Sequence, residues 1–565
     1  MFLCRGIMMA MYAIQKHLWR NMYMNHLSVY DYVVFLIYFV VILTYGFWVY
    51  RSKKKKRTDT KDYFLAEGSL TWWAIGASII ASNISAEHFI GMSGSGFAMG
   101  LAIASYEWMA AATLIIVAIF FLPIYVKNHI YTMPQFLSGR YNNTVSTLMA
   151  VFWLLVYVFV NLTSIFFLGA LAVETITGIP FNVCVLGLAI FSTIITLGGM
   201  KVIGYTDVIQ VLVLVLGGLV TCYMALDLAS DKLHAKGVLD VLPLLRQQSA
   251  DHFHMIFHKG DKYYNDLPGI AVLAGGLWIN NLNYWGCNQY IVQRALGADL
   301  KTGRAGLLFA AFLKLLIPVI VVIPGIAVYV LFQKGYFHSE MVDAAGNVKP
   351  DHAYPVLMNL LPTGIKGLAF AALTAAIVAS LAGKCNSIAT IFTLDIYKKF
   401  MHPEATEKKM VSVGRWAVIV SSLLAIIVAP ALRSFDQVYQ FIQEYVGFIS
   451  PGVFAIFLLG FFWKRTTSRA ALTAALLTIP LSVLFKFLPE LSSEAIAPIP
   501  FLNRMSWVFC IIIALMILIS LTDPESKNNP KGLKIEKEMF RVTPAFTVAS
   551  MVIIGILAAI YTVFW

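Results

Sequence analysis

Charged residues are scarce in this chain of 565 residues. Asp, Glu, Lys and Arg together make up only 13% of the sequence, whereas 59% of it is hydrophobic and the mean hydropathy is +0.76. A water-soluble chain of this size needs more charge than that to cover its surface. The composition therefore excludes a soluble globular protein and indicates a polytopic membrane protein.

Cysteine is also scarce. The six cysteines are scattered without the spacing of a metal site or of a disulfide framework: Cys4, Cys184, Cys222, Cys287, Cys385 and Cys510. We interpret them as packing residues. The sequence also lacks a recognisable set of nucleophile, base and orienting group, so nothing in it indicates an enzyme.

Apolar stretches of membrane-spanning length recur along the chain. We expect fourteen of them: Tyr30–Tyr50, Thr71–Phe97, Leu101–Val126, Val145–Thr177, Phe181–Leu197, Tyr205–Leu226, Leu267–Val292, Ala305–Gln333, Pro362–Tyr397, Trp416–Leu432, Gln437–Phe462, Ala470–Phe487, Met505–Leu521 and Ala545–Phe564. A segment in lipid must satisfy its own backbone hydrogen bonds. The sequence therefore predicts an all-α fold with about fourteen transmembrane helices.

Acidic residues are outnumbered by basic ones, 29 to 42, which gives a formal charge of +13. The basic residues concentrate in alternate connections, among them the run Lys53–Lys56, and basic loops stay in the cytoplasm. This asymmetry predicts a multi-pass protein of the cell inner (plasma) membrane with both termini outside. We interpret the basic run as a loop that flanks the membrane, not as a nucleic-acid-binding patch.

Two apolar stretches carry polar interruptions, "ASNISAEHFIG" (Ala81–Gly91) and "NLNYWGCNQY" (Asn281–Tyr290). Interrupted helices in corresponding positions are typical of transporters built from inverted repeats, whose unwound backbone lines the binding site. We expect two inverted five-helix repeats, at 71–230 and 267–463, in a leucine-transporter-type core. An N-terminal tail (1–29), a peripheral helix with a basic cytoplasmic loop (30–70) and three peripheral C-terminal helices (464–565) complete the predicted organisation.

Few polar side chains lie within the spans, and each is informative because burying such a group in a membrane is costly. Glu107, Lys314, Asn281 and Gln443 offer hydrogen-bond donors and acceptors, and Tyr284 offers a flat ring. A neutral polyhydroxylated solute needs both, since each hydroxyl donates and accepts. The set predicts a cavity for a small-molecule sugar, although Lys314 and Glu107 could instead pair as a structural bridge.

At these residues the chain resembles the solute:sodium symporter family, from about residue 26 to the end. The resemblance rests on several long motifs, which include "NISAEHFIGMSGSGFAMGLAIASYEW", "GGLWINNLNYWGCNQYIVQR", "FAAFLKLLIP" and "FIQEYVGFISPG". It implies sugar contacts at His88, Glu107, Asn281, Lys314 and Gln443, an inner gate at Tyr284, and an outer gate at Met92, Tyr106 and Tyr439. A family serine that touches the sugar is replaced by Ala110, so the hexose, galactose or glucose, stays open.

The resemblance also implies Na+ as the co-transported ion. Its site would use the carbonyls of Ala81, Ile84 and Ala376 and a hydroxyl pair that reads Ala379–Ser380 here, so that Ala379 is a lost ligand. Lys384 follows Ser380 by one helical turn, and Asp207 resembles the family's ion-exit aspartate. The Lys384 ammonium could replace the mobile cation and pair with Asp207, or it could extend to the cytoplasmic vestibule while sodium still binds.

Three functions remain open at this point. The first is sodium-coupled symport of a hexose by alternating access. The second is a sodium-independent or proton-linked sugar carrier in which Lys384 takes the place of the cation. The third is a sugar-gated sensor that binds without transport. The sequence leaves the oligomeric state unknown.

Overall fold

The computed structural model describes residues 27–52, 70–130, 132–197, 200–296, 298–343, 346–435, 438–492, 497–527 and 529–565. Most of the predicted N-terminal tail and the basic run after Ser52 lie outside the described residues. The described chain is all-helical apart from loops and one isolated β-bridge between Val342 and Val348. The predicted all-α fold is therefore confirmed.

Apart from the helices at the two helix breaks, the main helices are α2 (Val29–Ser52), α7 (Leu122–Lys127), α8 (Met133–Arg140), α9 (Asn143–Leu155), α10 (Thr163–Thr177), α11 (Phe181–Thr196), α12 (Met200–Lys232), α13 (Val241–Gln248), α17 (Leu300–Gln333), α19 (Ala353–Leu360), α20 (Ile365–Ile391), α21 (Glu407–Val428), α23 (Ser450–Phe462), α24 (Ser468–Leu491), α25 (Phe501–Thr522) and α26 (Pro544–Val563). Every predicted apolar stretch coincides with one or more helices.

The predicted number of fourteen spans is not confirmed. Among the described residues, ten helices are long and apolar enough to cross a membrane, or eleven if α22 (Val438–Val446) and α23, bent by 44°, form one span. The difference arises where helices break or are short. The first predicted interrupted stretch, for example, contains α4 (Trp72–Asn83), which has only 12 residues.

The first interruption is a true break in the helix. α4 ends at Asn83, because Ile84 adopts extended dihedral angles (φ −72°, ψ 122°), and the chain resumes as the π-helical η2 (Glu87–Met92) and α5 (Ser93–Met99). Ser85 stabilises the break locally, since its hydroxyl accepts a hydrogen bond from the Glu87 amide at 3.1 Å. A serine that bonds the backbone in this way competes with the helical hydrogen-bond pattern.

The second interruption is a break as well. α15 (Gly276–Gly286) ends before Cys287, and α16 (Gln289–Leu296) begins two residues later. Tyr157 closes the gap from the π-helical η5 (Val156–Leu162), because its hydroxyl accepts from the Gln289 amide at 3.1 Å and donates to the Asn288 side chain. Both predicted discontinuous helices are therefore present. No observation tests the predicted repeat boundaries, which stay a prediction.

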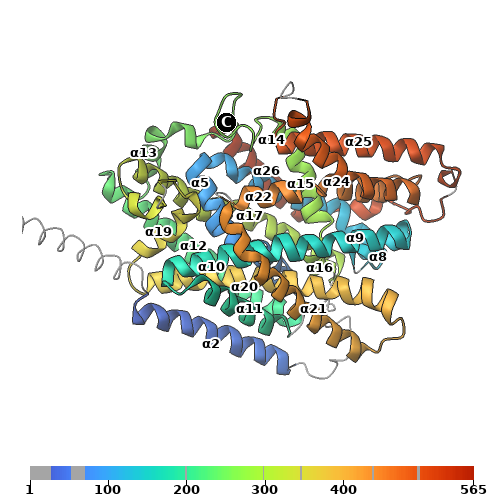
Figure 1. The fold of residues 1–565 in the computed structure, drawn as a ribbon, viewed down its shortest axis with the longest axis horizontal. Helices are drawn as coiled ribbons and strands as arrows, with labels where there is room; N and C mark the ends of the chain where they lie inside the picture. Colours follow the sequence, from blue (N-terminus) through green and yellow to red (C-terminus); the bar gives the residue numbers. More distant parts are fainter. Residues whose placement is uncertain are drawn as a thin grey trace, which may run out of the picture.

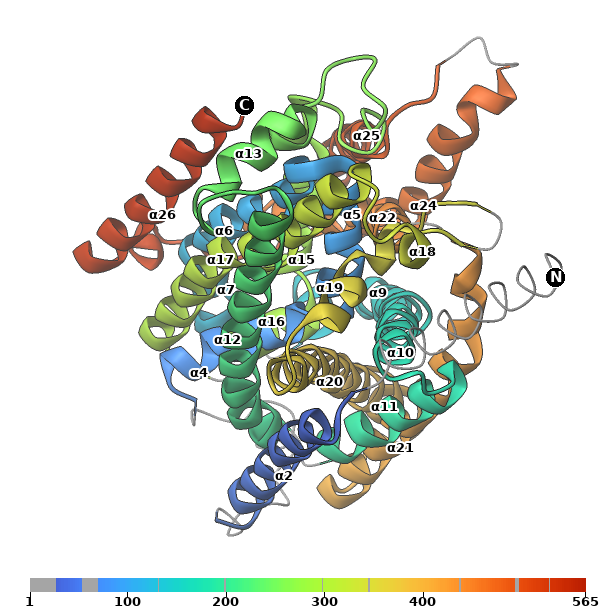
Figure 2. The same cartoon turned by 90° about the vertical axis from the view of Figure 1, so that its left-hand side faces the viewer.

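The long helices α12, α17 and α20 pack against α4 in the interior, and α17 also packs against α5 and α6 (Ser105–Ile116). Figure 1 shows the helices running roughly side by side across the molecule. Figure 2 looks along several of them, with α10 and α20 nearly end-on inside the bundle and α2, α24 and α26 at its rim. The rim helices expose large apolar side chains, as expected for surfaces in contact with lipid.

Candidate functional site

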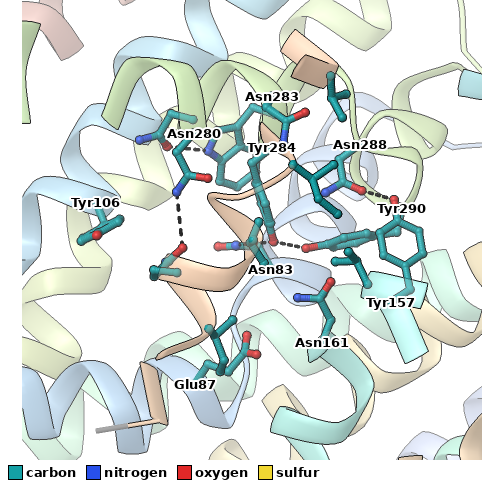
Figure 3. A pocket seen from close by; sticks show the side chains of 18 of the residues that line it. Asn83, Glu87, Tyr106, Tyr157, Asn161, Asn280, Asn283, Tyr284, Asn288 and Tyr290 are labelled. Carbon is teal, nitrogen blue, oxygen red and sulfur yellow. Dashed lines mark hydrogen bonds between the residues drawn. The ribbon is translucent and has the colours of Figure 1, made fainter. Parts of the chain in front are cut away.

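A small cavity of about 90 Å³ lies between the two helix breaks (Figure 3). Its wall is rich in amide and phenol groups from α4, η2, α6, η5, α15, α16 and α22, and it includes Asn83, Glu87, His88, Tyr106, Glu107, Tyr157, Asn161, Asn280, Asn281, Asn283, Tyr284, Asn288, Tyr290, Tyr439 and Gln443. Five of the cavity-lining residues are asparagines from the second broken helix and its break or from η5. Such a wall suits a polar solute of small-molecule size.

Glu107 is the centre of a charged group at one side of the cavity. One carboxylate oxygen lies 3.3 Å from His88 Nε2, and the other contacts the Lys314 ammonium. Lys314 also donates to the Asn83 side-chain oxygen and is itself fully buried. The Ser85 amide donates to His88 Nδ1 at 3.4 Å, so a neutral imidazole would carry its proton on Nε2 and donate it to Glu107. The Lys314–Glu107 pairing considered from the sequence is therefore present.

Tyr284 lies across the cavity between the two broken helices (Figure 3). Its hydroxyl accepts from Asn83 Nδ2 at 2.8 Å and from the Tyr290 hydroxyl. The Tyr157 and Tyr290 rings meet edge to face with centroids 5.5 Å apart. A single tyrosine thus joins α4 to α16, and its role as the inner gate stays a prediction.

Two predicted amides stand in different surroundings. Gln443 donates to the Tyr439 hydroxyl at 2.8 Å and accepts from Asn280 at 3.3 Å. Asn281 lines the cavity too, but its side chain already bonds within α15, to the Leu277 carbonyl at 3.1 Å and to the Trp285 indole at 3.1 Å. Gln443 could therefore exchange both of its hydrogen bonds, which go to other cavity-lining side chains, for bonds to a solute hydroxyl. Asn281 would have to give up hydrogen bonds within α15 to bind one.

The predicted outer gate is only partly assembled at the cavity. The Tyr106 and Tyr439 rings meet edge to face with centroids 5.8 Å apart, and both line the cavity. Met92 is fully buried and is not among the lining residues. The role of Met92 as an outer-gate residue stays a prediction.

The predicted cation residues lie together where α4 ends against α20. Ala81, Ile84, Ala376, Ala379 and Ser380 are all buried, and the Ser380 hydroxyl donates to the Ser82 carbonyl at 2.9 Å. Carbonyls in the last turn of a helix have no following turn to bind them. The Ser82 hydroxyl is buried as well and has no hydrogen-bond partner within the described part of the chain. These oxygens fit a hard cation such as Na+.

Asp207 does not pair with Lys384, which removes one of the two alternatives considered for that lysine. Asp207 accepts from the Ser78 hydroxyl at 2.5 Å and lies 3.8 Å from Arg294 Nη2. Arg294 comes from α16 and also donates to the Ser78 carbonyl at 3.0 Å. The arginine of the second broken helix thus occupies the place beside Asp207 that this alternative gave to the lysine.

Lys384 does not extend toward solvent either, since only 1% of its side chain is exposed. Its ammonium donates to the Ser380 hydroxyl at 3.2 Å and lies 4.0 Å from Glu87 Oε2. The same nitrogen lies 5.1 Å from the centre of the Tyr290 ring. Lys384 therefore lies between the predicted cation residue Ser380 on α20 and the cavity wall on η2.

Sequence reasoning missed Glu87 as a site residue, along with several amides and phenols of the cavity wall. The Glu87 carboxylate accepts from the Ser164 hydroxyl at 2.5 Å and from the Ser85 hydroxyl at 3.2 Å. The signal was present in the first polar interruption, where a glutamate precedes His88. The density of asparagines in and directly before the second interruption was a similar signal for Asn280, Asn283 and Asn288.

Two broken helices that meet at a polar cavity, inside a bundle with lipid-facing flanks, define a membrane transporter and not an enzyme. The chain belongs to the sodium:solute symporter family, whose sequence model matches residues 63–478.

Individual relatives agree with this assignment. The chain is 46% identical to a "Sodium/glucose cotransporter" of Vibrio parahaemolyticus over 546 residues, which is 95% of this chain and 99% of that protein. It is 34% identical to the human "Sodium/myo-inositol cotransporter 2" over 462 residues, which is 78% of this chain and 67% of that protein.

Solved structures show the same fold. A structure of a Na+-coupled sialic acid symporter in its substrate-bound, outward-open state superimposes with a TM-score of 0.74 at 23% identity, over 88% of this chain and 98% of that one. Mhp1, a transporter of the nucleobase-cation-symport-1 family, superimposes with a TM-score of 0.51 at 15% identity, over 86% and 98% of the two chains. These likenesses support the predicted leucine-transporter-type core.

Proposed function

We propose that the protein carries out sodium-coupled symport of a hexose by alternating access. The observation that carries this proposal is the cavity wall, in which charged, amide and phenol groups converge between the two broken helices. A hexose presents hydroxyls that both donate and accept, and an unpaired buried polar group costs about 1–3 kcal/mol. A wall with both kinds of group therefore selects a polyhydroxylated solute over an apolar one.

The predicted sugar residues divide into two groups in this proposal. Glu107 offers a carboxylate, His88 an imidazole ring and Gln443 an amide, all on the cavity wall. Lys314 acts from behind Glu107, where it fixes the carboxylate. Tyr284 serves as the inner gate and the Tyr106–Tyr439 contact as the outer one.

Sodium is the proposed co-transported ion. It would be held by the Ser380 and Ser82 oxygens and by carbonyls at the end of α4, including the predicted ones of Ala81 and Ile84, with Ala376 opposite. An ion that bridges α4 and α20 stabilises only conformations in which these helices stay together. The ion thereby shifts the carrier toward the state that accepts sugar.

The coupling is sufficient for strong accumulation. One positive charge gains about 2.3 kcal/mol per 100 mV of membrane potential. A tenfold sodium gradient adds about 1.4 kcal/mol. With one sodium per sugar, these terms together allow accumulation of about 500-fold.

The proposed location is the cell inner membrane with both termini outside. Support comes from contacts at the two ends of the described chain. Asp31, near the start of α2, accepts from the Gly364 amide at 2.7 Å, in the connection after α19. The Trp565 carbonyl, at the C-terminus, lies 3.0 Å from His254 Nδ1. Both partners belong to connections that the sequence-based prediction assigns to the outside, so the contacts are consistent with the proposed orientation.

Uptake into proteoliposomes tests the proposal. Radiolabelled galactose, glucose and myo-inositol would each be offered with a sodium, potassium or proton gradient. We expect uptake of a hexose that only the sodium gradient drives strongly. Uptake driven equally by a proton gradient would favour the sodium-independent carrier, and binding without uptake would favour the sensor. A preference for myo-inositol would keep the symport and correct the substrate.

A pair of glutamate variants provides the matched control. Glu107→Gln removes the charge at the cavity and should abolish uptake. Glu536→Gln removes a charge from an exposed loop, where Glu536 pairs with Lys127 at 2.6 Å, and should leave uptake unchanged. Equal uptake by the two variants would contradict a sugar site at Glu107.

A further inference from the structure

Two buried ion pairs flank the serines at the junction of α4 and α20. Arg294 and Asp207 lie on one side, 3.8 Å apart, and Lys384 and Glu87 lie on the other, 4.0 Å apart. Gly383 makes this close arrangement possible, because a Cβ there would lie 2.6 Å from Arg294 Nη2 and 2.8 Å from the Ser82 hydroxyl. The four charges sum to zero, so the junction is electrically balanced before any ion enters.

One buried hydroxyl at the junction nevertheless lacks a hydrogen-bond partner among the described residues. Ser380 donates to the Ser82 carbonyl and accepts from Lys384, while the buried Ser82 hydroxyl has no partner within the described residues. A buried hydroxyl without a hydrogen bond is costly and points to a ligand that completes it. A cation is the natural ligand for a group of carbonyl and hydroxyl oxygens.

We propose that the Lys384 ammonium and the transported sodium ion compete for the Ser380 hydroxyl. This competition lowers the affinity for sodium. When sodium binds, the displaced ammonium moves to the Glu87 carboxylate. This inference rests on the sodium-coupled symport proposed above. It assigns to Lys384 and Glu87 a role in ion affinity, distinct from ion ligation and from sugar binding.

The distances explain why the two cations compete. Lys384 Nζ lies 3.2 Å from the oxygen that sodium would also use, so both cannot contact it without strong like-charge repulsion. The side chain can yield, because lysine carries a compact charge on a flexible four-carbon stem. The displaced ammonium can move toward Oε2 of Glu87. The Glu87 side chain lines the cavity and is 11% exposed. Ala379, which supplies no hydroxyl, leaves sodium with fewer ligands to oppose the ammonium.

Sodium binding in the absence of sugar tests the competition directly. Binding of radioactive 22Na+ to the purified full chain in detergent would be compared between the wild-type protein and Lys384→Met. Removing the ammonium makes the junction net negative without sodium, so we expect the variant to bind sodium about tenfold more tightly, which is about 1.4 kcal/mol. Unchanged or weaker sodium binding by the folded variant would overturn the proposal.

Two further variants make the result specific. Lys366→Met removes a buried lysine near the start of the same helix, about 27 Å away along α20, and should leave sodium affinity unchanged. Glu87→Gln removes the acceptor for the displaced ammonium and should weaken sodium binding, an effect that should disappear in Lys384→Met/Glu87→Gln. Equal effects of Lys384→Met and Lys366→Met would show a general charge effect and refute the competition.

Lys384→Gln serves as a second variant if Lys384→Met is not monodisperse, and the same tighter binding is expected. The outcome is separable from that of the proposed function. Wild-type sugar uptake that ignores sodium would contradict the symport. Sodium-stimulated uptake together with unchanged 22Na+ affinity in the lysine variants would contradict only the competition.

Discussion

The two buried lysine–glutamate pairs of the core are built from the same residue types and differ in how they are held. Lys314 contacts Glu107 directly and is also fixed by Asn83, with no exposed side-chain surface. Lys384 stays 4.0 Å from Glu87, whose carboxylate is instead bound by Ser164 at 2.5 Å. In a pair in direct contact, both side chains are held in place. In a separated pair, the ammonium can change its partner.

Lys314→Met should have the larger effect of the two lysine substitutions. It leaves the Glu107 carboxylate buried without its cation, and removing one partner of a buried pair costs about 3–5 kcal/mol. We expect loss of sugar uptake and a clear fall in the thermal unfolding midpoint in detergent. In Lys314→Met/Glu107→Gln the midpoint should recover in part while uptake stays lost. A single variant as stable as the wild-type protein would show that this pair is not the rigid one.

Lys384→Met should cost much less stability. Glu87 keeps its two serine donors, so the variant loses mainly one hydrogen bond, to Ser380, which is worth about 1 kcal/mol. The unfolding midpoint should fall by less than half as much as in Lys314→Met under the same conditions. Equal losses in the two variants would mean that both lysines are structural and would remove the contrast between the pairs.

Tyr284→Phe removes the hydroxyl whose hydrogen bonds connect the surroundings of the two lysine–glutamate pairs at the cavity. The Tyr284 hydroxyl accepts from Asn83, which in turn accepts from Lys314, and it bonds Tyr290, which lies against Lys384. Losing one neutral hydrogen bond of about 1 kcal/mol should reduce sugar affinity about fivefold in equilibrium binding. Tyr284→Ala also removes the ring and should reduce it further. Equal affinity in Tyr284→Phe and the wild-type protein would remove the hydroxyl from the site.

Both helix breaks could be predicted from the sequence, because polar residues within an apolar stretch are costly in lipid unless they line a cavity or an unwound segment. The same argument identified Glu107, Lys314 and Gln443, because charged and amide side chains are rare within membrane spans and each one therefore indicates a functional site. These residues do converge in the structure. Chemical type and spacing along the chain were sufficient for this part of the site.

Partners across the bundle could not be predicted in the same way. Asp207 lies beside Arg294, whereas Lys384 lies near Glu87 of η2. Met92 is buried and is not among the lining residues, although Glu87 and His88 of the same π-helical η2 are. The number of spans depends on where helices break, which hydropathy locates only roughly. Each of these facts is set by three-dimensional packing, not by local pattern.

Asp266 provides the control for any pH dependence of the two pairs. This residue lies in the connection before α14 (Ala271–Ala274), where burial and the nearby Glu444 raise its pKa to about 6. The folded protein therefore holds a proton that the unfolded chain releases at about pH 4. The stabilisation from this proton is complete below that pH and is lost as the pH rises to about 6.

The thermal unfolding midpoint of the wild-type protein should accordingly carry a component that falls between about pH 4 and pH 6, and Asp266→Asn should lack this component. The amide cannot ionise and resembles the protonated acid, so the variant should match the wild-type protein at low pH and exceed it at neutral pH. Parallel pH profiles of the two proteins would show that Asp266 does not titrate abnormally. Any slope that remains in Asp266→Asn must come from other groups, and repeating the profile in Lys314→Met and Lys384→Met would then assign it to the rigid pair, to the separated pair or to neither.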